Sequence, residues 1–353
     1  MASSAESRPP GGAPEDGWGL APAVVADVTD LSPHELAPET SHSAVTRLAR
    51  LLGRGLSAVG RDLRWLFGLI LVAMVFAAIV APLIAPHDPL LYHPLLVARP
   101  PSAIYLLGTD SSGRDVLSRV IYGARISLSV GLVSVLLGGI IGAMLGMVAG
   151  YVGGWIDRVI SIFVDVLLAF PSLILALALA ATLGARLASV VIAVPVGFTT
   201  LRFPVNTVNL VIALAVVRIP VYTRLARGQT LYVRSLDYVH AARTLGSRTW
   251  WLLRRHILPN IQSALLVQVT ISISFAILDE SVLSFLGLGA PPPTPEWGSM
   301  ISEAQAFLIN GDPWMMLGPV LALVLTVLSL NLFGDALRDR LDPRSAYREI
   351  RAR

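Results

Sequence analysis

The chain has 353 residues, of which 54% are hydrophobic and only 14% are charged, whereas soluble domains carry about 25% charged residues, so an ordinary cytosolic enzyme is excluded. A net charge of +4 on so apolar a chain also excludes a disordered or nucleic-acid-coating protein. All 27 basic residues are arginine and cysteine is absent, which excludes P-loop and Schiff-base lysines, disulfides and thiolate-bound metals.

The N-terminal part has too little apolar periodicity to form a core. Residues 1–46 are rich in Ala, Pro, Ser, Glu and Asp, with Arg8 as their single basic residue, which predicts a disordered cytoplasmic tail. They lack the basic start and apolar stretch of a secretory signal. Residues 47–64 hold five arginines against one aspartate, which predicts a basic amphipathic helix on the cytoplasmic side of the membrane.

Six apolar segments approach or exceed the length of about 20 residues that a membrane crossing requires. With the basic helix inside, six crossings place both termini in the cytoplasm. We therefore predict an all-α integral membrane protein with a first span and outer loop at 65–125, a core at 126–334 and a cytoplasmic tail at 335–353. The predicted spans are 65–86, 126–150, 159–185, 203–222, 261–287 and 313–334.

The charge of the loops fixes this orientation. The loop 224–260 carries seven arginines against one acid and is placed inside, whereas 288–312 has three acids, no arginine, and falls outside. The apolar stretch 187–201 is short and contains Pro195, and a crossing there would invert both loops. We predict a re-entrant or interfacial extension of the outer loop instead. Four arginines in the outer loop 87–125 depart from the rule that basic residues concentrate in cytoplasmic loops.

Glycines and alanines mark two helical features. Four glycines of the second span recur at a spacing of four, which predicts a close helix–helix seam, either as simple packing or beside a pathway. In the loop 224–260, Ala241 and Ala242 favour a helix, Gly246 favours its end, and Pro259 opens the next span. The loop therefore presents a short helix to the cytoplasm, for a protein partner or for anionic lipid. The four glycines are Gly138, Gly142, Gly146 and Gly150.

Five segments resemble the permeases of binding-protein-dependent ABC importers. Ala241-Ala242-x3-Gly246, followed by Ile257-Leu258-Pro259, is similar to the cytoplasmic "EAA" loop of that family. The other four are similar to the dipeptide, oligopeptide and nickel branch, and to the "C" member of its pair of permease subunits. The resemblance covers roughly 60–344, and these four segments are 107–119, 153–171, 283–298 and 335–344.

The resemblance implies the type I importer permease fold and a set of partners. These are a second permease subunit, two ATPase subunits that bind ATP and Mg, an extracytoplasmic substrate-binding protein and membrane lipid. The chain itself would be a non-catalytic, multi-pass subunit in a bacterial plasma membrane, with no cofactor of its own and no nucleic acid. ATP-driven alternating access would carry di- or oligopeptides, with nickel, glutathione or another small solute as the alternative.

The resemblance also implies a coupling helix that docks on an ATPase subunit, while the alternative is that its residues only fold the loop. His240 stands where the family has glutamate, and about 20 residues around 185–206 are extra relative to the family. The predicted coupling residues are Asp237, Tyr238, His240, Ala241, Ala242, Gly246, Leu258 and Pro259.

Two further sets of polar residues are candidates. Acids inside apolar spans usually face a cavity or a partner, so Asp165, Asp279 and Glu280 are candidates to line a peptide path. The alternatives are that they pair with Arg218 or with an arginine of the partner subunit, or that they lie near a span end in water. The segment 108–119 mixes turn formers with charges. It forms a network on the outer side, either near the docked binding protein or as support for the second span. That network comprises Gly108, Asp110, Gly113, Arg114 and Asp115.

Other functional classes lack their signatures. The six histidines are scattered without metal-ligand spacing, and no catalytic constellation is visible, so we predict neither a catalytic nor a metal site. A proton-coupled secondary transporter that relays protons through the three intramembrane acids would show inverted repeats, and none is convincing. A membrane-embedded enzyme or scaffold would need a polar catalytic cluster.

Overall fold

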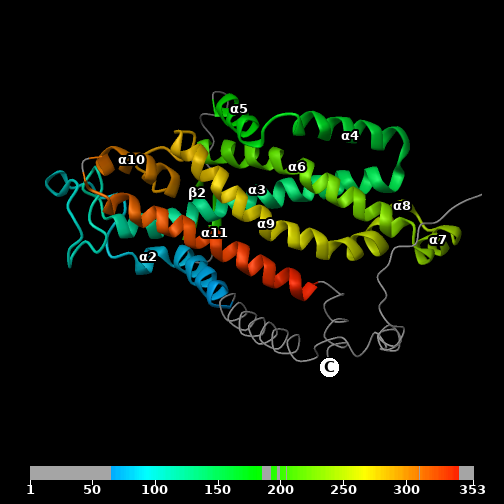
Figure 1. Cartoon of the computed structure of the whole chain (residues 1–353), viewed down its shortest axis with the longest axis horizontal. Coiled ribbons are helices and arrows are strands. Elements are labelled where there is room, and N and C mark those ends of the chain that lie inside the picture. The colour runs from blue at the N-terminus through cyan, green and yellow to red at the C-terminus, as the bar shows by residue number, and fades with distance from the viewer. Residues whose placement is uncertain (1–64, 185–191, 197–198, 204, 310, 342–353) are drawn as a thin grey trace, which may run out of the picture. The chain divides into compact units, whose positions relative to one another are not determined.

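The computed structural model describes residues 65–184, 192–196, 199–203, 205–309 and 311–341, all within one compact unit of the chain. The predicted tail 1–46 and basic helix 47–64 lie outside the described residues, as does the chain after 341. Helices make up most of the described part, and its one sheet has two strands (Figure 1). The prediction of a mainly helical membrane protein is therefore confirmed.

Four helices in the described residues are each long and apolar enough to cross a membrane. Each covers one predicted span to within two residues and continues beyond it on at least one side, because helix formers such as arginine and leucine extend the helix past its apolar stretch. The predicted tail at 335–353 therefore begins inside a helix. The four are α3 (Val116–Val152), α6 (Val205–Arg234), α9 (Leu258–Phe285) and α11 (Trp314–Leu341).

The third predicted span is broken into two helices. α4 (Gly154–Leu168) and α5 (Ser172–Gly184) meet at an angle of 91°, so the pair forms either one broken span or a re-entrant loop. Pro171 explains the break, because a proline disfavours helical backbone at the residue before it, here Phe170. The break was not predicted from the apolar pattern of 159–185, in which Asp165 is the one charged residue before the end of the segment.

The first predicted span is an apolar helix over Trp65–Ile79 within the described residues. A short helix α2 (Ala81–Ile84) follows, with Pro82 in its first turn. The outer loop then folds on itself through the one-turn helix η1 (Pro94–Leu96) and a bridge between Thr109 and Asp115.

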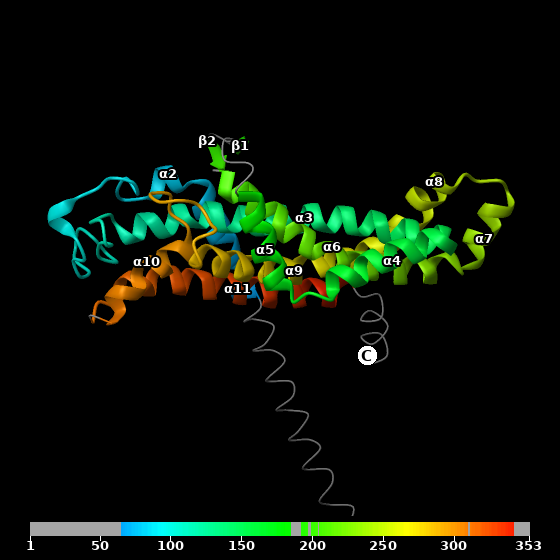
Figure 2. The same ribbon diagram turned by 90° about the horizontal axis from the view of Figure 1, so that it is seen from above.

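A β-hairpin lies in the segment that was predicted to be a re-entrant or interfacial extension. β1 (Ile192–Val196) pairs antiparallel with β2 (Thr199–Phe203), with Val196 opposite Thr199. Figure 2 shows it standing out from the helical body. The all-α prediction missed it, although β-branched residues at alternate positions of β1 are a strand signal.

The predicted loop 224–260 is mostly helical. α6 continues to Arg234, and α7 (Asp237–Thr244), α8 (Thr249–Leu252) and the π-helical turn η2 (Leu253–Ile257) then lead into α9. In Figure 1, α7 and α8 lie at one end of the helical body, and α10 (Trp297–Ile309) lies at the other with the outer loop. The two predicted sides of the membrane therefore correspond to opposite ends of the helices.

The glycine seam of α3 packs directly on the backbone of α6. A Cβ atom placed on Gly142 would lie 2.5 Å from the carbonyl oxygen of Ile219, far inside van der Waals contact. The other three glycines meet the α6 backbone in the same way, one turn apart. Only glycine permits this approach, which holds α3 and α6 together as a rigid pair. The α6 residues that these three glycines meet are Ala215, Thr223 and Arg227.

The buried core follows α6 along its length. One apolar cluster joins its first half to α3 and α5, and another joins its last turns to α7, η2 and α9. α6 is thus the element that connects the two ends of the molecule. Members of the two clusters are Val130, Ala176 and Leu214, and Val233, Val239 and Ile257.

Candidate functional site

Helix α7 buries one face and exposes the other. Val239 is buried and packs with Ile257 of the η2 turn. Successive residues of a helix rotate by about 100°, which places Asp237 and Ala241 on the side opposite Val239, and both are exposed, as is Leu245 directly after the helix. The predicted coupling helix therefore has an anchored side and a free side.

Gly246 ends α7 in the left-handed conformation. Its φ is +82°, its N–H donates to the Arg243 carbonyl, and the N–H of Ser247 donates to the Ala242 carbonyl. This pair of bonds is the usual way a helix terminates at glycine, and it confirms the helix end predicted there. Any other residue at 246 would strain the backbone, although the space around it is open.

The surface around α7 exposes several large apolar side chains among its polar ones. Leu245 is 86% exposed, Trp250 66% exposed and Tyr238 43% exposed. His240 is exposed too, and the N-terminus of α7 carries no side-chain cap, with Asp237 in its first turn instead. Clustered exposed aromatic and aliphatic side chains mark contact with a protein or a membrane.

A single arginine fixes the junction of α6 and α7 to the end of α3. Arg234, the last residue of α6, donates from Nη1 to the carbonyl oxygens of Gly150 (3.1 Å) and Tyr151 (2.8 Å). Pro259 lies in the first turn of α9 after Leu258, which is partly exposed. Arg234 therefore holds the junction before α7 against the end of α3.

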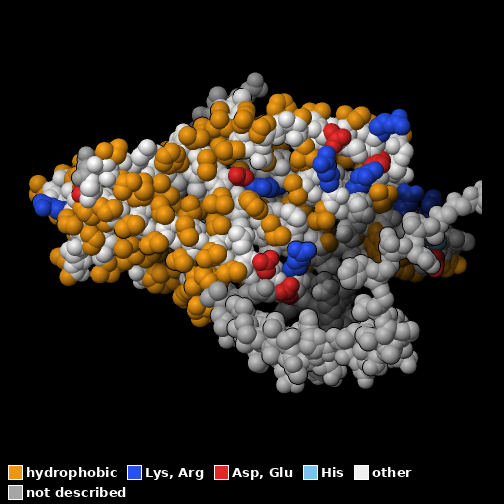
Figure 3. Space-filling model, in the orientation of Figure 1, with side chains coloured by type: hydrophobic (Ala, Val, Ile, Leu, Met, Phe, Trp, Pro, Cys, Tyr) orange, Lys and Arg blue, Asp and Glu red, His pale blue; other side chains and the backbone are white. Residues whose placement is uncertain are grey.

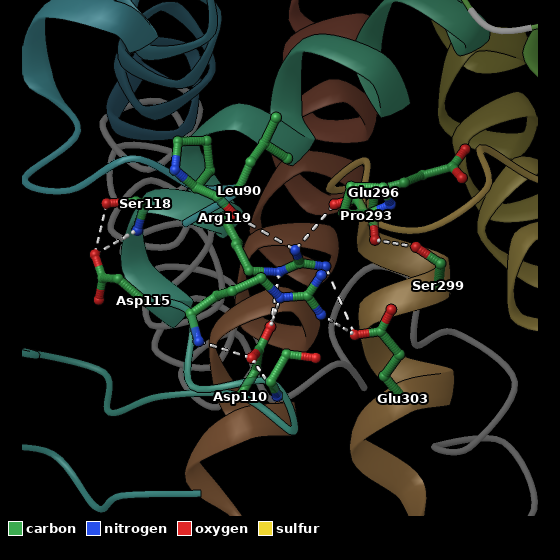
Figure 4. Close-up of polar contacts among 12 residues, drawn as sticks. Leu90, Asp110, Asp115, Ser118, Arg119, Pro293, Glu296, Ser299 and Glu303 are labelled. Carbon is green, nitrogen blue, oxygen red and sulfur yellow. Dashed lines mark hydrogen bonds and ion pairs between the residues drawn. The ribbon is translucent and has the colours of Figure 1, made fainter. Parts of the chain in front are cut away.

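At the opposite end, the outer loop, α3 and α10 meet in a buried charge network (Figure 4). Arg114 donates to Asp110 (2.7 Å) and to Glu303 of α10 (3.0 Å). Arg119 lies 3.1 Å from the same Asp110 oxygen and 3.6 Å from Glu303. Two cations alternate with two anions, so the network is neutral although the Arg119 side chain is only 1% exposed.

The turn before α3 presents these charges. Oδ1 of Asp110 accepts the N–H groups of Ser112 (2.8 Å) and Arg114 (2.9 Å), and Gly113 has a φ of +74° that suits glycine. Asp115 caps α3 by accepting the N–H of Ser118 at 3.0 Å. Gly108 also has a positive φ, of +73°. The turn formers and charges predicted in this segment thus hold the N-terminus of α3.

Glu280 holds the outer end of α9 rather than facing open space. It is fully buried and accepts hydrogen bonds from Ser127 at 3.3 Å and from Ser281 at 3.0 Å. Glu296, which is also fully buried, accepts the N–H of Ala290 at 2.7 Å.

Two other intramembrane acids pair with arginines of α6. Asp279 of α9 forms an ion pair with Arg218, one of the partners that the sequence suggested. Asp165 of α4 pairs with Arg224 at 2.7 Å. Asp157, one turn from the start of α4, pairs with Arg227 through two contacts, at 2.5 and 2.7 Å. α6 is therefore clamped to both α4 and α9 by charge.

Comparison with known proteins supports one family. Residues 142–347 match the model of the "Binding-protein-dependent transport system inner membrane component" family. The chain is 42% identical over 282 residues to the "Di/tripeptide transport system permease protein DppC" of Pseudomonas aeruginosa, covering 78% of this chain and 86% of that one. The chain belongs to this permease family. The subunit is thus a multi-pass inner-membrane transport protein, not an enzyme.

Two other relatives of the permease have similar identities. One is the "Glutathione transport system permease protein GsiD" of Pectobacterium atrosepticum, 42% identical over 280 residues, which cover 79% of this chain and 85% of the relative. The other is the "Probable D,D-dipeptide transport system permease protein DdpC" of Escherichia coli, 39% identical over 316 residues, which cover 89% and 99%. The predicted membership of the "C" branch is confirmed.

Three residues of the permease's outer end were not predicted as part of its network. Arg119 and Glu303 complete the ion pairs, and Glu296 anchors the segment before α10. The sequence does contain a signal for this pairing. The loop 87–125 carries four arginines, whereas 288–312, predicted on the same side, has three acids and no arginine. Complementary charge between two loops on one side of a membrane indicates that they pair.

Proposed function

We propose that this permease carries di- or oligopeptides across the bacterial plasma membrane as one of two permease subunits of an ABC importer. The three relatives bear names for di/tripeptides, glutathione and D,D-dipeptides, which are all small peptides. Nickel or another small solute is the alternative within the family. The proposed substrate therefore has peptide bonds and free charged termini.

The proposed complex contains a second permease subunit, two ATPase subunits that bind ATP and Mg, and an extracytoplasmic substrate-binding protein. We propose six spans with both termini in the cytoplasm. Four long helices, the bent pair α4 and α5, and the helix Trp65–Ile79 support this number. The outer network beside α10 is proposed to stabilise the surface on which the binding protein docks.

We propose that α7 is the coupling helix, and one observation carries this proposal. Its exposed face lies opposite an anchor, Val239, and Arg234 ties its base to α3. A force on α7 is therefore transmitted to α6 and, through the glycine seam, to α3. ATP binding would close the ATPase subunits and move the coupling helices as rigid elements, which opens the path outward. Hydrolysis would reset it.

The three intramembrane acids take different proposed roles. Asp165 is exposed on α4 and is proposed to line the path. Asp279 is proposed to brace α9 against α6, and Glu280 to position the C-terminal end of α9, because both acids are largely buried against partners within the chain. The sequence could not separate these roles, since it shows only that each acid interrupts an apolar stretch.

Replacement of Ala241 tests the coupling helix. Ala241→Trp places a bulky group on the exposed face of α7, and we expect the reconstituted importer to lose peptide-stimulated ATP hydrolysis by more than about tenfold, because close docking is lost. Ala241→Ser is the matched control and should retain coupling. Unchanged coupling in Ala241→Trp would refute the assignment, and uptake without ATPase subunits would favour a secondary transporter.

A further inference from the structure

α4 and α6 carry charges on a face where a membrane protein cannot expose them to lipid. The side chains of Asp165 and Arg224 are 63% and 61% exposed in the single chain. Arg224 lies on α6, which is long and apolar enough to cross a membrane, and Asp165 lies on α4, which reaches that length together with α5. Figure 3 shows acidic and basic side chains together over α4 and α6, on a largely hydrophobic face. Exposed charge in a span faces water or a partner because its transfer to hydrocarbon is costly.

A cleft lies beside this ion pair. Its volume is about 420 Å³, and Ser161, Asp165, Arg224 and Gly228 are among the residues that line it. Such a volume is within the range of pockets that hold small molecules. The cleft combines hydroxyl, carboxylate and guanidinium groups with open space, so it suits a small polar solute.

The two ion pairs of this face differ in how firmly they are made. Asp157 and Arg227 share two contacts, and Ser161 also donates to Asp157 at 3.4 Å, so this pair is a brace between α4 and α6. Asp165 and Arg224 share one contact, at 2.7 Å, and are far more exposed. An exposed pair contributes only about 0–1 kcal/mol, so its two groups exchange partners at little cost.

We propose that this cleft is a water-filled solute site, in which Asp165 binds an ammonium group and Arg224 a carboxylate of one zwitterionic solute. A peptide with free termini offers both groups, and a guanidinium binds a carboxylate well through its forked donors. A divalent cation would meet one carboxylate between two arginines, which repel it. The peptide identity rests on the proposed function, whereas the water-filled cleft does not.

Cysteine labelling of the complete importer tests this site, because the chain contains no cysteine of its own. Ser161→Cys is nearly isosteric and lies in the cleft, and Ile162→Cys, on the same helix turn, is the exposed apolar control. With a membrane-impermeant methanethiosulfonate on both sides of proteoliposomes, we expect Ser161→Cys to react about tenfold faster. Equal rates would overturn the water-filled cleft.

Protection by a dipeptide tests the ligand chemistry. Millimolar alanyl-alanine should slow labelling of Ser161→Cys at least about threefold, whereas N-acetyl-alanyl-alanine amide, which has neither charge, should not. Asp165→Asn added to Ser161→Cys should abolish protection, and Asp165→Glu should restore it. Equal protection by both peptides, or none by either, would overturn the zwitterion site. Labelling and protection without peptide-stimulated ATP hydrolysis would refute only the proposed function.

Discussion

Replacing Gly142 by leucine is expected to separate α3 from α6 and to destabilise the permease by more than about 3 kcal/mol. The nearest atom to a Cβ at this position is the backbone oxygen of Ile219, which no side-chain rotation can move away. Even Gly142→Ala should cost about 1–3 kcal/mol for the same reason. The measurement is the unfolding midpoint of the purified protein in detergent, together with its amount in the membrane.

Gly228 provides the matched control for Gly142. It lies within helix α6 and has no heavy atom within 4 Å of a Cβ placed on it. Gly228→Ala should therefore leave the unfolding midpoint unchanged or raise it slightly, since alanine favours a helix by up to about 1 kcal/mol relative to glycine. A Gly142→Leu protein as stable as Gly228→Ala would show that α3 and α6 do not pack through this seam.

Arg119→Met is expected to lower the free energy of unfolding by about 3–5 kcal/mol, because a buried network loses one of its two cations. Asp110 and Glu303 would then share Arg114 alone. Adding Glu303→Gln should recover part of the loss, since the charges balance again. The measurement is the denaturation midpoint of each variant in the same detergent.

Arg224→Met is the control for Arg119→Met, because its ion pair with Asp165 is exposed. We expect it to change stability by less than about 1 kcal/mol. If Arg119→Met were as mild as this, the outer network would be a surface feature rather than the support of α3.

The helices were largely predictable from the sequence, and their breaks were not. The length of the apolar stretches located α3, α6, α9 and α11. A segment that crosses a membrane must satisfy its backbone N–H and C=O groups within itself, and a helix does so over the whole crossing. It did not locate the bend at Pro171, since a proline in an apolar run either kinks a helix or ends it, and tertiary packing decides which. The β-hairpin was missed because 187–201 was judged only as a possible membrane crossing, from its length, Pro195 and the charge of the flanking loops.

The arginines show why the sites were harder to predict than the spans. Arg224 and Arg227 were counted as loop charge, yet they lie on α6 and pair with acids of α4. Arg114 and Arg119 departed from the charge rule for outer loops, and they pair with Asp110 and Glu303. A charge rule counts residues by segment, whereas pairing depends on distances that only the fold sets.

The central claim is that the exposed face of α7 binds the ATPase subunits, and photocrosslinking tests it most directly. A benzoylphenylalanine at Leu245, which is 86% exposed, should crosslink to an ATPase subunit in the assembled importer. The same group at Ile309, 83% exposed at the opposite end on α10, should not. An ATPase adduct from Leu245 alone is the predicted result, and its absence, or an equal adduct from Ile309, would contradict the account.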